Sequence, residues 1–152
     1  MTTNVAQQHP GVPVAARVLL REAAGRWLLV WHVTDGFTAH LPGGLVEPGE
    51  SPRAAALREL REEAGLLVDA SLTELFAVVW VPARTPGRRG RLEVIFTAVV
   101  DPRVAAAAVP VDVGEVARLE WAWPDRAVAV LHPVLAAALA GVEGPAYREI
   151  VR

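Results

Sequence analysis

The sequence predicts an α/β fold, an α/β/α sandwich in which a mixed sheet lies between helices. Strand-length runs of β-branched and aromatic residues recur along the chain, and segments with helical periodicity follow the third run and the last one. The length of 152 residues suits one domain. We therefore expect a flexible N-terminal arm over the polar residues 1–12 and a single domain over residues 13–152.

Three strands are predicted before the first helix. Residues 12–22 alternate, with apolar residues at even positions on one face and Arg17 and Arg21 on the other, as a half-buried strand does. Residues 26–33 return after a turn at residues 23–25 and complete a hairpin. Residues 39–41 form a short third strand that leads directly into Gly43 and Gly44.

The remaining elements are predicted from turn and cap residues. Ser51 is placed to cap a helix, Pro52 suits its first position, and Gly65 ends it. Residues 71–82 and 91–100 read as a second hairpin, residues 103–115 as an irregular connection, and residues 117–124 as a last strand. We expect Asp125 to cap a final helix that continues to about Ala140.

Composition excludes several classes of partner. The net charge of −2 provides no general attraction for nucleic acid or for an anionic membrane surface. The apolar residues 127–142 are too short for a membrane span and are interrupted by His132 and Pro133. Because the sequence lacks cysteine and its start lacks the features of a secretion signal, we expect a cytoplasmic protein. The apolar share of 53% and the Ala-rich final helix slightly favour a homodimer.

The helix predicted over residues 51–65 carries an acidic face. Glu59, Glu62 and Glu63 fall within an arc of roughly 100°, opposite the apolar side that docks on the sheet. Like charges at this spacing repel, and they can instead ligate a hard divalent cation such as Mg²⁺. On the helix alone, the alternative of an ordinary charged surface helix remains open.

The acidic helix belongs to a longer pattern that starts at the glycine turn. The pattern is Gly, five residues, Glu, seven residues, Arg-Glu, an aliphatic residue, any residue, Glu-Glu, any residue, Gly and an aliphatic residue. The matching residues are Gly44, Glu50, Arg58, Glu59, Leu60, Glu62, Glu63, Gly65 and Leu66. This pattern resembles the signature of the Nudix hydrolases without departure. Outside it, Ala39 stands where many members carry a tryptophan, and we expect Phe37 to fill that space.

The resemblance implies a Mg²⁺- or Mn²⁺-dependent pyrophosphohydrolase. Such an enzyme cleaves the diphosphate linkage of a small nucleotide, a nucleoside triphosphate or a nucleoside diphosphate joined to a group X. Glu62 and Glu63 are the expected principal ligands, with the Gly43 carbonyl, and Glu59 is either a ligand or the general base. Arg58 is expected to orient Glu59, and Glu50 to support the turn.

A further metal ligand is expected from outside the signature. Glu115 stands five residues ahead of Glu120 and Trp121, which resembles the position of an additional glutamate in MutT-type members. Glu120 competes for the role but points to the other sheet face if Trp121 points into the core. Glu93 competes too, although its place in an alternating strand suits a solvent-facing residue. The alternative that Glu115 is an ordinary loop carboxylate stays open.

Substrate choice is weakly encoded. Arg84, Arg88 and Arg89 lie in the loop of the second hairpin and are candidates for phosphate binding, with a solvated loop tip as the alternative. Pro82 resembles a marker of ADP-ribose pyrophosphatases, or it simply ends a strand. A function of another class is a nucleotide sensor without turnover.

The tryptophans and the histidines are the remaining candidates for the functional site. Trp27 and Trp31 share one strand face, which favours a place in the core over a nucleobase clamp. The four histidines show no metal-ligand spacing, and of these only His40, beside the glycine turn, is a candidate for the site.

Overall fold

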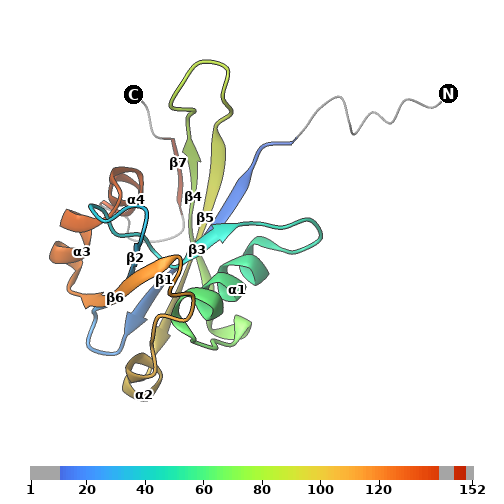
Figure 1. Ribbon diagram of the computed structural model, residues 1–152. Helices are drawn as coiled ribbons and strands as arrows, with labels where there is room; N and C mark the ends of the chain where they lie inside the picture. The colour runs from blue at the N-terminus through green and yellow to red at the C-terminus, as the bar shows by residue number, and fades with distance from the viewer. Residues whose placement is uncertain (1–10, 141–145, 150–152) are drawn as a thin grey trace.

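The computed structural model describes residues 11–140 and 146–149, so the predicted arm falls almost entirely outside the described residues (Figure 1). The elements in chain order are β1 (Val14–Glu22), β2 (Trp27–His32), β3 (Gly43–Leu45), α1 (Pro52–Ala64), the 3₁₀ helix η2 (Ala70–Leu72), β4 (Glu74–Val81), β5 (Arg91–Val100), α2 (Pro102–Ala106), β6 (Val116–Ala122), α3 (Pro124–Val130), α4 (Pro133–Leu139) and β7 (Ala146–Glu149). Within these residues, the helices are too short or too polar to cross a membrane.

One mixed sheet organises the molecule. Its strand order is β6-β2-β1-β5-β4-β7, and β3 pairs with β1 off this path. The central pair β1–β5 and the edge pair β4–β7 are parallel, and the other pairs are antiparallel. β1 pairs with β3 through residues 15–17 and with β2 near its other end, and the segment from His40 to Pro42 crosses between them. The Gly43 turn therefore lies at the point where β1 changes its pairing partner from β3 to β2.

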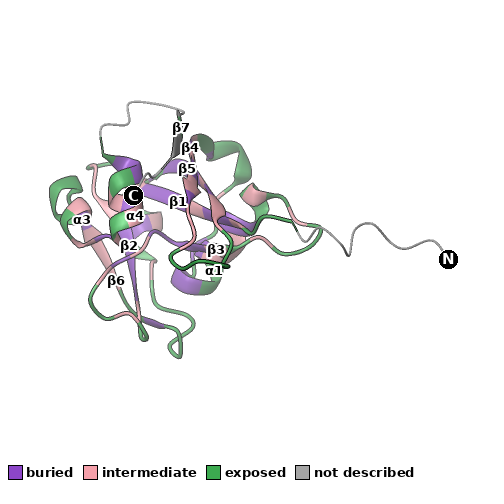
Figure 2. Ribbon diagram, turned by 90° about the horizontal axis from the view of Figure 1, so that it is seen from above, coloured by how far each residue is buried: buried purple, intermediate pink, exposed green. Residues whose placement is uncertain are grey.

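Helices cover both faces of this sheet, which confirms the predicted sandwich. α1 and α2 pack over one face, and α3 and α4 over the other, each with its own cluster of buried residues (Figure 1). Seen from above, buried residues follow the strands and exposed residues lie on the outer sides of the helices (Figure 2). β1 is buried on both faces, with Val18 at 0% and Leu19 at 2% exposure, so the prediction of a half-buried strand was wrong.

α1 begins and ends as predicted. The Ser51 hydroxyl accepts a hydrogen bond from the Ala54 amide, and Pro52 occupies the first helical position. Gly65 ends the helix at φ 68°, a left-handed conformation that glycine adopts without strain. Leu60 and Ala64 are buried against the sheet. The helix therefore has a fixed rotation, and this decides where its glutamates point.

Several local predictions were wrong. The final helix is two helices, because Pro133 interrupts the first and His132 caps the second through its ring nitrogen. Asp125 lies inside α3, whose N-cap residue makes no side-chain cap bond. The connection after β5 contains the short helix α2, capped by Asp101. Phe37 does not fill the space expected for a tryptophan, because it is 94% exposed whereas Ala39 is fully buried.

Candidate active site

A cavity of about 410 Å³ lies between the acidic face of α1 and the loop that precedes β6. The residues that line it are Glu59, Glu62, Glu63, Val111, Asp112 and Glu115. Backbone hydrogen bonds hold the loop against the end of α1, from Val109 to Ala64 and from Val111 to Glu63. The structure thus brings Glu115 to the same cavity as the signature glutamates. We call this space the acidic cavity.

Glu63 is the most buried carboxylate of the acidic cavity, at 4% exposure, although it lies on the acidic face of α1. Its Oε2 accepts a 2.9 Å hydrogen bond from the Gly43 amide, and its Oε1 lies 3.6 Å from His32 Nε2. Burial raises the pKa of Glu63 to about 8, and the charges of Glu59 and Glu115 act in the same direction. Ionisation of Glu63 is therefore unfavourable in the absence of a positive charge nearby.

Arg58 organises the other glutamates of the signature. It binds both carboxylate oxygens of Glu50, at 2.7 and 3.2 Å, and donates to Glu59 at 2.9 Å and to Glu62 at 3.1 Å. Glu50 also accepts from the Glu47 amide, which ties α1 to the loop before it. Arg58 thus contacts Glu59, the residue that it was expected to orient. Arg61, one helical turn further along, is exposed.

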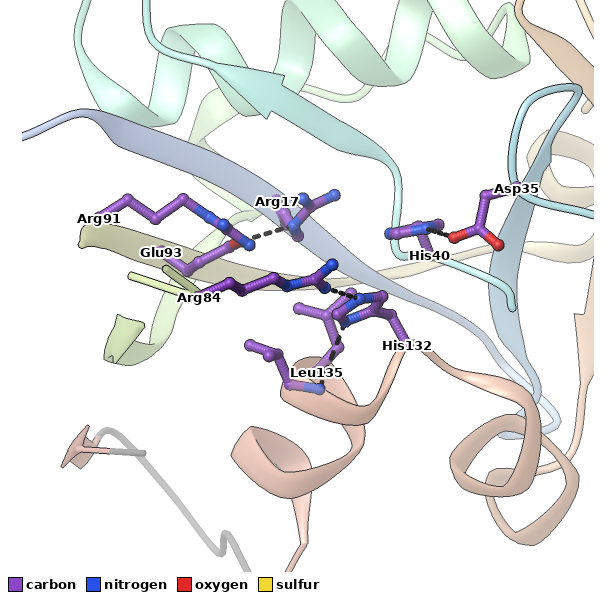
Figure 3. Close-up of a pocket in the computed structure, with 9 residues that line it drawn as sticks. Arg17, Asp35, His40, Arg84, Arg91, Glu93, His132 and Leu135 are labelled. Carbon is purple, nitrogen blue, oxygen red and sulfur yellow. Dashed lines mark hydrogen bonds and ion pairs between the residues drawn. The ribbon is translucent and has the colours of Figure 1, made fainter. Parts of the chain in front are cut away.

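A second cavity, of about 420 Å³, lies on the α4 side of the sheet (Figure 3). The residues that line it are Arg17, Asp35, His40, Arg84, Arg91, Glu93, His132, Val134 and Leu135. They come from β1, the loop after β2, the β4–β5 hairpin and the start of α4. Of the predicted phosphate-binding arginines, Arg84 lines this cavity, whereas Arg88 and Arg89 are not among its lining residues. We call this space the basic cavity.

Glu93 forms the floor of the basic cavity with two arginines. It is 1% exposed and binds Arg17 Nε at 2.5 Å and Arg91 Nε at 2.8 Å. Burial alone would raise the pKa of Glu93, but the two arginines outweigh it and lower the pKa. The expectation of a solvent-facing residue was therefore wrong. The strand alternation was right, but α4 covers the face to which Glu93 points.

Three imidazoles line up beside these charges. The ring centroids of His32 and His40 are 5.2 Å apart, and those of His40 and His132 are 5.4 Å apart. Asp35 accepts from Thr38 at 2.7 Å and contacts His40 Nε2 at 3.2 Å, and these hydrogen bonds lower the pKa of Asp35 to about 2. Burial lowers the pKa of His40 to about 4. At neutral pH the ring is uncharged, and Nε2 carries the proton that it donates to Asp35.

Only part of this row was predictable. His40 was singled out in the sequence because it precedes the glycine turn, but no spacing rule indicated His32 or His132. His132 comes close because its backbone amide donates to the Ala39 carbonyl, which joins the start of α4 to the loop before β3. Arg84 Nη2 lies 2.6 Å from His132 Nε2, at the mouth of the cavity (Figure 3).

Arg17 lies between the two cavities. It pairs across the sheet with Gly43, and its side chain packs so closely on that glycine that a Cβ there would lie 2.7 Å from Arg17 Cγ. The guanidinium faces the basic cavity, binds Glu93 and donates to the Leu41 carbonyl at 3.2 Å. Its charge also opposes the rise in the pKa of Glu63. A ligand that spans both cavities would therefore pass Arg17.

Other candidates lie elsewhere. Glu120 binds Arg118 at 3.0 Å, Arg126 at 3.2 Å and the Trp31 indole at 3.0 Å, and it is not among the residues that line the acidic cavity. Trp31 is 7% exposed and packs in the core beneath α3 and α4, and Trp27 packs against the same core, as predicted. Pro82 follows the last residue of β4 and is half-buried.

The donor set of the acidic cavity fits a hard divalent cation. Within residues 11–140 and 146–149, no three histidine, aspartate or glutamate side chains already converge as a finished ion site. Carboxylate oxygens are nevertheless the groups that Mg²⁺ and Mn²⁺ prefer. Burial and the neighbouring carboxylates raise the pKa of Glu63, and a bound cation would lower it by favouring the ionised carboxylate. The residues that would hold the cation are Glu59, Glu62, Glu63 and Glu115, with the Gly43 carbonyl.

The α/β/α sandwich with a glycine turn and a glutamate-bearing helix is the architecture of the Nudix domain. The profile of the NUDIX domain family matches residues 11–141, and the chain belongs to this family. The NUDIX domain of Shewanella oneidensis NrtR, solved in complex with ADP ribose, superposes with a TM-score of 0.69 at 18% identity, over 91% of this chain and 95% of that domain.

Two sequence relatives match over shorter segments. The "Uncharacterized Nudix hydrolase orf19" of Rhodococcus erythropolis is 37% identical over 76 residues, 43% of this chain and 41% of that protein. The "Putative 8-oxo-dGTP diphosphatase 2" of Mycobacterium tuberculosis is 49% identical over 57 residues, 38% of this chain and 32% of that protein. The chain therefore spans less than half the length of these relatives.

Proposed function

We propose that this chain is a Mg²⁺- or Mn²⁺-dependent pyrophosphohydrolase. Its substrate is a nucleoside triphosphate or another nucleoside diphosphate derivative, and its products are a nucleoside monophosphate and a phosphate-bearing remainder. The observation that carries the proposal is the acidic cavity, where four glutamates from α1 and from the loop before β6 face one space. Membership of the Nudix family and the hydrolase names of its relatives support it.

The chain's own residues supply binding and orientation. A bound divalent cation would neutralise the diphosphate oxygens and favour ionisation of the attacking water. Arg58 holds Glu59 by a charge-assisted hydrogen bond, so that its carboxylate is oriented before substrate arrives. Burial raises the pKa of Glu59, which suits it to accept a proton from water, as a general base does.

Arg17 is the residue best placed to contact the diphosphate. It is positively charged, its side chain is 12% exposed, and it lies between the acidic and basic cavities. Because Glu93 and the Leu41 carbonyl take two of its N–H groups, its position is fixed while three N–H groups stay available. The rest of the substrate would then enter the basic cavity.

The test is a product assay with purified protein. Nucleotides of several classes, including ADP-ribose, dinucleoside polyphosphates and oxidised nucleoside triphosphates, are incubated with Mg²⁺, and monophosphate release is measured by chromatography. We expect turnover that stops in excess chelator and returns when Mg²⁺ is added in excess. Full turnover in chelator would refute the metal dependence. Tight nucleotide binding without turnover of any compound would indicate the sensor instead.

The homodimer stays a prediction. Val109, Val111 and Val113 are exposed beside the acidic cavity, and an association that covered them would bury apolar surface. Light scattering at micromolar concentration distinguishes a dimer from a monomer.

A further inference from the structure

The basic cavity has an excess of positive charge. Arg17, Arg84 and Arg91 contribute three guanidinium groups, whereas the two carboxylates are Asp35 and Glu93. Both histidines are neutral near pH 7, because burial lowers the pKa of His40 and of His132. With Arg17, which also faces the scissile diphosphate, the cavity carries a net charge of +1, in contrast to the glutamates on the other side of Arg17. An anionic group is attracted to one cavity and repelled by the other.

The carboxylates of the basic cavity are already engaged, and the arginines retain donors. Asp35 accepts from Thr38 and His40, and Glu93 accepts from Arg17 and Arg91. A guanidinium has five N–H groups, and the hydrogen bonds of Arg17 and Arg91 in the structure use only some of them. The free hydrogen-bonding capacity of the floor therefore consists mainly of cationic donors, which bind phosphate oxygens well.

A nucleobase is a poor fit for the same space. None of the nine described residues that line the cavity is phenylalanine, tyrosine or tryptophan, the side chains that most often stack on bases. His40 and His132 stack on each other at 27°, so each already uses one ring face. Among the described residues that line the cavity, only Val134 and Leu135 are apolar. The lining matches a charged, hydroxylated group better than a flat apolar one.

We propose that the basic cavity is a subsite for a phosphate group of the substrate other than the diphosphate that is cleaved. The proposal rests on the proposed function, since it assumes that the acidic cavity holds the scissile diphosphate. Preferred substrates then carry additional phosphate, either as a longer polyphosphate chain or as a phosphomonoester on a sugar. Compounds that carry only the scissile diphosphate place no phosphate in this subsite.

Two matched pairs of compounds test the proposal and separate the two sources of phosphate. Diadenosine diphosphate and diadenosine tetraphosphate differ only in chain length, and dephospho-coenzyme A and coenzyme A differ by one phosphomonoester. We expect kcat/KM for the phosphate-richer member of at least one pair to be about tenfold higher, which corresponds to one charge-assisted hydrogen bond. The pair that shows the difference identifies the source. Equal values within both pairs would overturn the proposal.

Variants assign the effect to the cavity. Arg84→Gln removes a cation at the cavity mouth, and Arg91→Lys retains the charge beside Glu93 but removes the planar donor group. We expect both variants to reduce the preference within the discriminating pair about tenfold. Arg103→Gln, an exposed position on α2, is the control and retains the preference. An unchanged preference in both cavity variants would refute the assignment.

Binding separates a failure of this proposal from a failure of the proposed function. If no compound is hydrolysed, the proposed function is wrong, and the subsite is tested by calorimetry with inorganic tripolyphosphate. Binding that is weakened about tenfold by Arg84→Gln and kept by Arg103→Gln still supports an anion subsite. Binding that is absent in the wild type, or unaffected by Arg84→Gln, overturns it.

Discussion

Gly44→Ala tests whether the orientation of Glu59, and not merely its presence, is needed for activity. An added Cβ at Gly44 would lie 2.3 Å from Glu59 Oε1 and 2.6 Å from its carboxylate carbon. Non-bonded atoms prefer about 3.5 Å, so the carboxylate must move by about 1 Å. This displacement would weaken the 2.9 Å hydrogen bond with Arg58 and turn Glu59 away from its present position. A misplacement of about 1 Å can lower a rate about a hundredfold.

Stability distinguishes this effect from damage to the fold. The atoms displaced by Gly44→Ala are the end of a flexible side chain, so we expect the free energy of unfolding to change by less than about 1 kcal/mol. Gly43→Ala would place Cβ 2.2 Å from the Ala16 carbonyl at φ 151°, so it should cost at least about 2 kcal/mol. At Gly36 an added Cβ meets nothing within 4 Å, which makes Gly36→Ala the control.

The assay combines steady-state hydrolysis with urea denaturation for the three variants. We expect Gly44→Ala to lose activity and keep its stability, Gly43→Ala to lose stability, and Gly36→Ala to keep both. Wild-type kcat and KM in Gly44→Ala would refute the reasoning, because the carboxylate would then work from a different position.

Three further outcomes are expected. Glu63→Gln should lower kcat at least about a hundredfold and leave the thermal denaturation curve in place, because the amide keeps the acceptor for Gly43 but cannot act as an anionic metal ligand; normal turnover would contradict its role. Glu93→Gln should lower the free energy of unfolding in urea by about 3 kcal/mol, since two guanidiniums then face an uncharged amide; a stable variant would show that the ion pairs contribute little. The folded-state pKa of His40, about 4, is below its usual 6.5, so the fold favours the neutral ring. The contribution of the neutral His40 ring to the free energy of unfolding is complete above pH 6.5. It is lost as the pH falls towards 4, by up to about 3 kcal/mol. Urea denaturation at pH 7 and pH 4.5 should show a smaller difference in His40→Gln than in the wild type, and equal differences would refute it.

Features with local causes were predictable from the sequence. The ends of α1 depend on Ser51, Pro52 and Gly65, which act within one helical turn of themselves. The two hairpins follow from turn residues between apolar runs. The signature glutamates were predicted to share a helix face, and three of them do face one cavity with Glu115.

Features that depend on packing between distant segments were not predictable. Alternation indicated that Glu93 lies on one sheet face, but only the position of α4 decides that this face is covered. Phe37 is exposed where burial was expected, because a loop conformation has no periodic signal in the sequence. The row of histidines depends on a backbone hydrogen bond between His132 and Ala39, which no local pattern encodes.

The parallel pairing of β1 with β5 has a consequence for how the chain folds. Arg17 and Glu93 are 76 residues apart in sequence, and each belongs to a hairpin that can form from neighbouring residues alone. Joining the two hairpins closes a long loop, which is slow because the entropy of closure is lost before the contacts form. We therefore expect β1–β5 docking to come late during folding and to limit its rate. Nascent chains whose synthesis has not reached β5 would contain the complete Nudix signature but lack the buried partner of Arg17.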